Sequence, residues 1–408
     1  MADRDPFNQT LADDAVTWLI EGAQSAPMPQ DVLFQLSTKL TAAGLPLSRA
    51  AVFVTTLHPN VMGRGFFWQR GAAEVRVAEA SFDIVETDEY TDNPIPHVTA
   101  TRKTVRRRLL ETDCPDDYKV LGELRADGVT DYIMMPLVFT TGATHAVSWS
   151  TDAEDGFSEQ DIATLTAVQP ALARIAEAFA LRRVARNLLD AYLGAQAGER
   201  VLAGQIKRGD GEDIRAVIWF SDLRGSTPLA DRLPRGEFLA HLNAFFECMA
   251  GAVLDGGGEV LRFIGDSVLA IFPISRQGGA EVADSTPEQA CATAVAAAED
   301  AIARITAANA ARETAGEDPL NYGIALHLGD VMYGNIGVPE RVEFTVIGAA
   351  ANEAARQEGL CKTLGQNFLV SESIAAHHPG PWRSLGHHEL RGVGAAVEVF
   401  TSNDQGSP

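Results

Sequence analysis

The stretch "VLRFIGDSVLAIF", residues 260–272, determines the fold predicted for the second half of this chain. Two apolar runs rich in β-branched and aromatic residues flank a short Gly-Asp-Ser segment, and this pattern predicts a β-hairpin. One carboxylate, Asp266, stands in the turn. Because both flanking runs are suited to burial, the role of this single charge depends on what the fold brings beside it.

A second aspartate occupies a comparable place. The segment "IRAVIWFSDLRGST", residues 214–227, predicts a buried strand that runs into a turn, with Asp222 at the end of the strand. On adjacent strands the two aspartates would share one sheet edge, and a hard divalent cation such as Mg²⁺ would compensate their repulsion. The alternative is that each aspartate only stabilises its own turn. The "LRGST" backbone, opened by Gly225, also offers N–H groups of the kind that bind phosphate.

The other segments of this half complete a β-α-β-β-α-β order with appended strands, which puts two helices on one face of an antiparallel sheet. The pattern predicts two amphipathic helices, a strand pair or a strand plus turn, a further helix and a last hairpin, at residues 235–258, 286–316, 320–337, 349–365 and 387–402 respectively.

The sequence pattern of the first half predicts a separate domain that contains both helices and strands. Apolar spacing predicts a helix over residues 31–44, and "YIMMPLVFTTGATHAVSWST", residues 132–151, predicts two strands around a turn. Ser158 is a candidate N-cap for a helix that continues through residues 181–205. That continuation is either a coiled-coil seam in a dimer or a surface helix packed on its own domain. The basic segment "TRKTVRRRLLE", residues 101–111, either meets an anionic partner or is a solvated helix face.

Composition excludes some functions. The 408-residue chain carries 33 basic and 55 acidic residues, and its net charge of −22 argues against nucleic acid or anionic membranes as main partners. Four cysteines without a CxxC spacing predict neither a zinc site nor a disulfide framework. The acidic, polar N-terminus is unlike a secretory signal, and no uncharged run reaches the roughly 18 residues of a membrane span. We therefore expect a cytoplasmic protein.

Five motifs together resemble one known family, the catalytic domain of class III adenylate/guanylate cyclases. The match covers about residues 213–400, and its ordered motifs are "FSDLRGST", "GGGEVLRFIGDSVLAIF", "GIALHLGDVMYGNIG", "EFTVIGAAANEAARQE" and "LGHHELRGVGAAVEVF". The resemblance implies an α+β protein whose catalytic domain has a ferredoxin-like (βαββαβ) core. It also implies an active site shared between two protomers, and hence a homodimer.

The resemblance assigns roles to individual residues. Asp222 and Asp266, with the Leu223 carbonyl, would hold two Mg²⁺ or Mn²⁺ ions per active site. Asn352 and Arg356, which share a helix face, would orient the ribose and stabilise charge on the α-phosphoryl group. The remaining phosphate contacts would come from Phe220, Gly225, Ser226, Thr227 and Arg391.

The residues that read the base depart from the commonest adenylate-cyclase pattern. Arg262 stands where the family usually has lysine, and Thr345 where it often has aspartate. Arginine can donate to adenine N1, and the threonine hydroxyl can accept from the adenine amino group. Arginine cannot accept a hydrogen bond from guanine, so ATP is the expected substrate and cyclic AMP the product. A guanylate or mixed-specificity cyclase, or a degenerate nucleotide-binding signalling module, remains the alternative.

Residues 31–180 resemble a GAF-type sensory domain with a small-molecule ligand, chiefly through the strand pair and the helix that follows it. We therefore expect four parts in the chain. They are an N-terminal helical segment (1–30), the GAF-like domain (31–180), a helical linker (181–212) and the catalytic domain (213–402).

Overall fold

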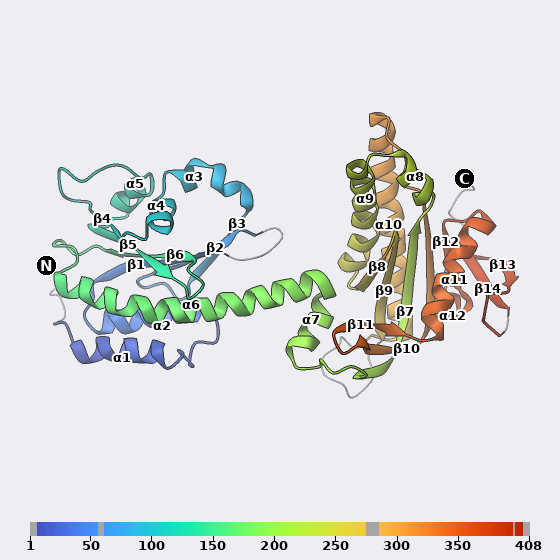
Figure 1. Ribbon diagram of the computed structural model, residues 1–408, viewed down its shortest axis with the longest axis horizontal. Helices are drawn as coiled ribbons and strands as arrows, with labels where there is room; N and C mark the ends of the chain where they lie inside the picture. Colours follow the sequence, from blue (N-terminus) through green and yellow to red (C-terminus); the bar gives the residue numbers. More distant parts are fainter. Residues whose placement is uncertain (1–5, 56–60, 275–284, 395, 403–408) are drawn as a thin grey trace. The chain divides into compact units, whose positions relative to one another are not determined.

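The computed structural model describes residues 6–55, 61–274, 285–394 and 396–402. The chain divides into two compact units, Met1–Leu188 and Leu189–Pro408. Both units mix helices with a β-sheet (Figure 1). The mixed α/β class expected from the sequence is therefore confirmed.

The first unit is built on a six-stranded sheet in the order β3-β2-β1-β6-β5-β4, with antiparallel neighbours throughout. Its strands are β1 (Leu47–Thr55), β2 (Gly63–Gln69), β3 (Arg76–Ala80), β4 (Val105–Arg108), β5 (Asp131–Val138) and β6 (Thr144–Thr151). Its helices are α1 (Gln9–Ile20), α2 (Pro29–Ala42), η1 (Phe82–Glu86), α3 (Asp88–Thr91), α4 (Pro94–Thr101), α5 (Val120–Ala126) and most of α6 (Glu159–Leu193).

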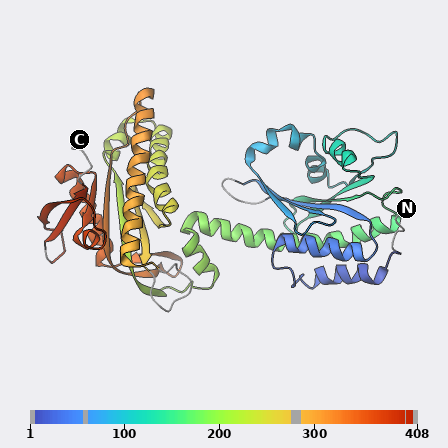
Figure 2. The same ribbon diagram turned by 180° about the vertical axis from the view of Figure 1, so that it is seen from behind.

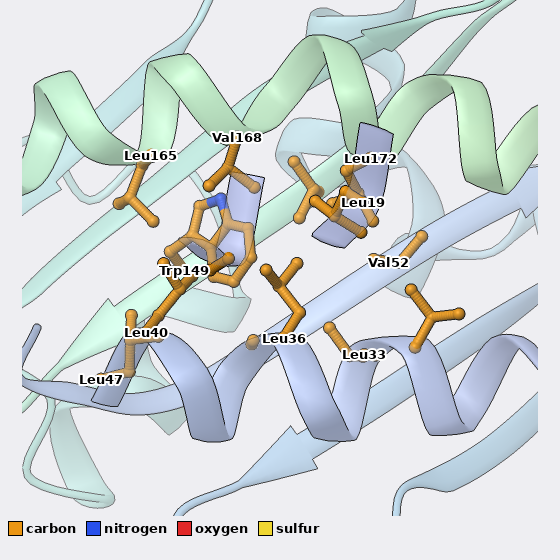
Figure 3. Packing of buried hydrophobic residues seen from close by; sticks show 14 of the residues in the cluster. Leu19, Leu33, Leu36, Leu40, Leu47, Val52, Trp149, Leu165, Val168 and Leu172 are labelled. Atoms are coloured by element: carbon orange, nitrogen blue, oxygen red, sulfur yellow. The ribbon is translucent and has the colours of Figure 1, made fainter. Parts of the chain in front are cut away.

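A hydrophobic core lies on each face of this sheet, because alternate side chains of a strand point to opposite faces. Along β5, Ile133 and Met135 belong to a core shared with α1, α2 and α6, whereas Tyr132 and Met134 belong to a core shared with α4 and α5. Figure 3 shows the first core, where Trp149 of β6 lies among leucines and valines of α2 and α6. The helix predicted at residues 31–44 is confirmed as α2.

The start of α6 has the predicted cap. The Asp161 backbone N–H donates to Ser158 Oγ (3.2 Å), and the Ser158 N–H donates to Asp161 Oδ2 (2.8 Å). The two side chains thus satisfy two N–H groups that a helix start leaves without partners. The helix continues for 35 residues, which confirms the prediction as far as Leu193. Gly194, with φ of 85°, then interrupts it before α7 (Ala195–Leu202).

The basic segment at residues 101–111 differs from the expected helix face. Val105 is buried and begins β4, which pairs with β5, so the segment is mostly strand and turn. Two of its arginines have aspartate partners: Arg106 pairs with Asp131 at 2.6 Å, and Arg107 pairs with Asp117 at 2.5 Å. The expectation of a solvated helix face was wrong because edge pairing, which depends on a distant strand, overrides the local charge pattern.

The Arg106–Asp131 pair gives a stability prediction. Asp131 is fully buried and also accepts from the Phe157 N–H at 3.0 Å. Asp131→Asn leaves the Arg106 charge without its partner and should destabilise the first unit by about 2 to 3 kcal/mol. Hydrogen exchange of the β5 and β6 amides in the whole protein measures this. Asp127→Asn at an exposed position is the control. Equal protection of the β5 and β6 amides from exchange in the two variants would contradict the prediction.

The second unit contains an eight-stranded sheet in the order β13-β14-β12-β10-β7-β9-β8, with β11 paired to β10. Its strands are β7 (Gly211–Leu223), β8 (Glu259–Ile264), β9 (Ser267–Ile274), β10 (Tyr322–Val338), β11 (Arg341–Ile347), β12 (Phe368–Ser371), β13 (Trp382–His388) and β14 (Val397–Ser402). Its further helices are α8 (Ser226–Arg232), α9 (Arg235–Asp255), α10 (Pro287–Ala315), α11 (Ala349–Leu364) and α12 (Glu372–His377).

The hairpin predicted from residues 260–272 is confirmed as β8 and β9, with Gly265 and Asp266 between them. Residues 320–337 were expected to contain a strand pair or a strand plus turn, and this was wrong, because β10 is one continuous strand. Its first part pairs with β7 and its last part with β11. The two partners overlap at residues 332–334, so backbone pairing holds residues 322–338 in one strand along its whole length.

Helices cover both faces of this sheet (Figures 1 and 2). Val217 and Trp219 of β7 pack in a core with residues of α9 and α10. Ala216 and Ile218, on the opposite face of the same strand, pack in a core with residues of α7 and α11. The predicted pair of helices on one face is therefore α9 and α10, and α11 lies on the other face.

Candidate active site

The ends of β7 and of the β8–β9 hairpin meet at one place. Asp222 is opposite Ser267 in the pairing of β7 with β9, and the Leu223 N–H donates to the Asp266 carbonyl at 3.2 Å. Antiparallel pairing thus brings the last residues of one strand beside the turn of the other. Asp222 and Asp266 consequently belong to one group at the sheet edge.

Electrostatics show that the two carboxylates are close. Partial burial raises the pKa of Asp222 above its usual value, and the negative charge of Asp266 raises it further. The Ser267 hydroxyl donates to Asp222 Oδ1, and Arg224 lies near enough to oppose the rise. The site therefore concentrates negative charge that a cation would stabilise.

A third carboxylate, which the sequence analysis did not identify, lies behind this pair. Glu358 of α11 is 8% exposed, and burial, followed by the charges of Asp222 and Asp266, raises its pKa to about 7. It faces Gly323 of β10, the strand partner of Asp222, where an added Cβ would lie 2.0 Å from Glu358 Oε1. The helical spacing of Ala354 and Glu358 on one buried face was the available signal.

The donor set can be tested against a metal ion. Asp222 and Asp266 offer carboxylate oxygens, and the adjoining backbone offers carbonyl oxygens, all of which suit Mg²⁺ or Mn²⁺. Within residues 6–55, 61–274, 285–394 and 396–402, no group of three or more His, Cys, Asp or Glu side chains is arranged to hold a metal. The residues thus fit a cation whose remaining ligands come from phosphate and water, as Mg²⁺ commonly has.

The predicted base-reading residues lie on a different pair of strands. Arg262 is on β8, and its Nε lies 2.9 Å from Glu343 Oε1 of β11, so the two side chains form an ion pair. Thr345 is two residues beyond Glu343 on the same strand, so the two side chains share a face. The Thr345 Oγ1 is buried and has no hydrogen-bond partner among the described residues. A buried hydroxyl without a hydrogen-bond partner costs free energy unless a ligand or a water molecule forms that bond.

The predicted phosphate-binding residues on α11 face solvent. Asn352 and Arg356 are one helical turn apart and exposed, and Asn352 Nδ2 donates weakly to the Gly348 carbonyl at 3.4 Å. A Cβ built on Gly392 would lie 3.8 Å from Arg356 Nη2, so the loop that carries Arg391 passes beside Arg356. Arg391 is exposed. The structure therefore gathers Asn352, Arg356 and the Arg391 loop on one side of α11.

Helix α11 is fixed to the sheet by a polar contact beside Asn352. His327 Nε2 of β10 lies 3.2 Å from Glu353 Oε2, and burial lowers the pKa of His327 below its usual value despite the opposing effect of Glu353. The lowered pKa of His327 favours its neutral form, which weakens the charge attraction in this contact.

The remaining predicted residues lie at the end of β7 and just beyond it. Phe220 is partly buried against the core on the α11 face, and the Leu223 side chain is buried on the α9 and α10 side. Gly225 has φ of 76°, a left-handed conformation that favours glycine, and it precedes the first residues of α8. Ser226 and Thr227 are the first two residues of that helix.

The structure assembles these residues into separate groups. In the part of the chain that the structure describes, no hydrogen bond or ion pair joins Asp222 or Asp266 to Arg262, Thr345 or Arg356. Each group is at least partly exposed and has unused hydrogen-bonding capacity. The chain thus presents the parts of a site rather than one closed pocket.

Comparison with known proteins finds a match over the region that carries most of these groups. Residues 212–378 match the family model described as "Adenylate and Guanylate cyclase catalytic domain". The adenylate cyclase of Anabaena cylindrica is 31% identical over 170 residues, which cover 41% of this chain and 32% of that protein. Adenylate cyclase 1 of Rhizobium meliloti (strain 1021) is 26% identical over 278 residues, which cover 66% of this chain and 40% of the relative.

A solved structure described as "Structure of a bacterial light-regulated adenylyl cyclase" is 27% identical, with a TM-score of 0.38, over 47% of this chain and 91% of that chain. The matched regions span 32% and 40% of the lengths of the two curated relatives. Among the described residues, no helix combines the length and the apolar composition that crossing a bilayer requires.

Proposed function

Because residues 212–378 match the adenylate/guanylate cyclase catalytic domain, we propose that this protein converts ATP into 3′,5′-cyclic AMP and pyrophosphate. The observation that carries the proposal is the meeting of Asp222 and Asp266 at one sheet edge within the matched region. In this reaction the ribose 3′-hydroxyl attacks the α-phosphorus, the bond to the β-phosphate breaks, and the hydroxyl proton is released.

Asp222, Asp266 and the Leu223 carbonyl would hold Mg²⁺ or Mn²⁺, two ions per active site. When bound, such ions act as Lewis acids that activate the hydroxyl and neutralise the triphosphate. The pairing of β7 with β9 sets the position of Asp222, and the pairing of β8 with β9 sets the position of the turn that carries Asp266. The two negative charges are therefore held at the same edge of the sheet. Ser267 orients Asp222 through its hydroxyl hydrogen bond.

The side chains on and near α11 would act on the substrate directly. Asn352 and Arg356 share a helix face, so both can reach one ribose phosphate. Arg356 supplies positive charge for the charge that develops on the α-phosphoryl oxygens. Arg391, on the loop beside Arg356, would contact the terminal phosphates, and the backbone of residues 225–227 with Phe220 would complete their binding.

Base recognition would fall to Arg262 and Thr345. The unpartnered, buried Thr345 hydroxyl supports this role, because the adenine amino group could donate to it. Arg262 can donate to adenine N1. A guanylate or mixed-specificity cyclase remains the second candidate, since the Glu343 carboxylate beside Arg262 is an acceptor that guanine could use.

A homodimer would bring the separate groups together, because one protomer would supply the aspartates and its partner the base-reading and α11 residues. Large apolar side chains are exposed around the β8–β9 turn and the β10–β11 hairpin, where a second copy could cover them. They include Phe263, Ile264, Met332, Val338, Val342 and Ile347. On α6, Leu181, Leu188 and Tyr192 are exposed at seven- and four-residue spacing, which suits a coiled-coil seam.

The first unit would act as a GAF-like sensory domain that binds a small molecule and regulates the catalytic domain. Its own sheet and two hydrophobic cores support an independent function. Cytoplasmic location, expected from the sequence, belongs to the same proposal.

The experiment that tests the proposed function follows cyclic products by chromatography after incubation of the purified protein with ATP or GTP and Mn²⁺. Cyclic AMP as the main product supports the proposal. Dominant cyclic GMP would replace it with the guanylate cyclase alternative. Nucleotide binding without any cyclic product would leave a nucleotide-binding signalling module instead.

A further inference from the structure

The base-reading arginine has a partner that the sequence analysis did not foresee. Arg262 Nε lies 2.9 Å from Glu343 Oε1, and the two side chains are 38% and 39% exposed. Both groups can therefore be reached by a ligand or by a second copy of the chain. The contact joins β8 and β11, the two strands that carry Arg262 and Thr345.

This contact uses one edge of the guanidinium. Arginine has five N–H donors in a rigid plane, and an ion pair closest at Nε restrains the guanidinium while leaving the terminal amino groups available. Among the described residues, no hydrogen bond and no other ion pair engages the Arg262 side chain. The free donors thus belong to a side chain that is held beside Glu343.

We propose that Glu343 is a positioning residue for base recognition, which holds Arg262 so that its terminal N–H groups face the base beside the Thr345 hydroxyl. This inference rests on the proposed function and deepens it. Adenine presents an acceptor at N1 and a donor at its amino group, which match the free donors of Arg262 and the oxygen of Thr345.

The same pair disfavours guanine. Guanine presents N1–H and amino donors that need an acceptor, and the Arg262 terminal nitrogens cannot accept. The Glu343 carboxylate is paired with Arg262, so guanine would have to compete with the guanidinium for it. Selectivity for ATP therefore depends on the pair of residues, and Glu343 contributes only while Arg262 is present.

The test measures KM and kcat for ATP and GTP in five variants of the whole chain. Glu343→Ala should raise the KM for ATP about five- to tenfold, as expected when a partly exposed ion pair stops orienting its arginine, with kcat changed less than about threefold. Glu343→Gln keeps the shape of the side chain but removes the charge of the ion pair, so it should raise the KM for ATP about as much as Glu343→Ala. Glu340→Ala, at an exposed position of the same hairpin, is the matched control.

The decisive comparison is Arg262→Ala with Arg262→Ala/Glu343→Ala. A residue that acts only through Arg262 adds no further loss when Arg262 is already absent, so the two proteins should have the same KM for ATP. Equal effects of Glu343→Ala in both backgrounds would overturn the inference. An effect of Glu340→Ala as large as that of Glu343→Ala, or a Glu343→Gln variant that keeps the KM of the unmodified protein, would also overturn it.

Failure of the proposed function gives a different result. If the unmodified protein forms no cyclic product, the same variants are compared by their Kd for a non-reactive ATP analogue. Arg262→Ala and Arg262→Ala/Glu343→Ala should then have the same Kd. A protein that binds no nucleotide would overturn both the proposed function and this inference.

Discussion

Replacing Asp266 with alanine should abolish cyclic AMP formation, lowering kcat by at least about a thousandfold. Asp266 and Asp222 are the two carboxylates of the proposed cation site, and removal of one leaves too few oxygen ligands to hold the ions. The β8–β9 turn can still form, because the Leu223 N–H bonds to the backbone carbonyl of residue 266 rather than to its side chain. Steady-state turnover with ATP and saturating Mn²⁺ measures the effect.

A matched control separates the loss of a ligand from a general loss of negative charge. Asp213→Ala removes an exposed carboxylate from the other end of β7 and should keep turnover within about twofold, as is usual for surface substitutions. Thermal unfolding of both variants should stay close to that of the unmodified protein. An Asp266→Ala enzyme with more than a tenth of the original activity would remove these aspartates from the proposed mechanism.

Two inactive variants should restore activity when they share a dimer. If one protomer supplies Asp222 and Asp266 and its partner supplies Arg262, Asn352 and Arg356, a heterodimer of Asp266→Ala with Arg356→Ala has one site with every group intact. Its other site carries both substitutions. Heterodimers purified through two different affinity tags should therefore show about half the activity of the unmodified dimer, because one of two symmetric sites works.

The control pairs two variants from the same group. A heterodimer of Asp222→Ala with Asp266→Ala damages both sites and should stay inactive. Restored activity in this control, or no recovery in the Asp266→Ala and Arg356→Ala heterodimer once its assembly is verified by mass, would contradict a site shared between protomers. The exposed apolar residues around the β8–β9 turn would then need another explanation.

Local patterns predicted much of the fold. The hairpin at residues 260–272, the helix at residues 31–44 and the start of α6 at Ser158 were all predicted correctly. In each case the signal is contained in a few consecutive residues: alternating apolar side chains, a helical repeat, or a capping hydroxyl. Such signals depend on backbone geometry, which is the same in any fold.

Predictions failed where the outcome depended on a distant partner. The basic segment that begins near residue 101 became strand β4 because β5 pairs with it, and residues 322–338 became one strand because β7 and β11 support different parts of it. Glu358 was missed for the same reason. Its proximity to Asp222 arises from the packing of α11 on β10, and the helical spacing of Ala354 and Glu358 indicates only a shared face, not the strand on which that face packs.

The sequence alone determined which residue types are present for the chemistry: two aspartates at strand ends, an asparagine and an arginine one helical turn apart, and the unusual Arg262 and Thr345. Only the tertiary structure decided which of them lie together. It placed Asp222 beside Asp266 through strand pairing, and it gave Arg262 the Glu343 carboxylate from a strand far along the chain. The physical reason is that ion pairs and shared burial depend on distances in space, whereas sequence patterns report only distances along the chain.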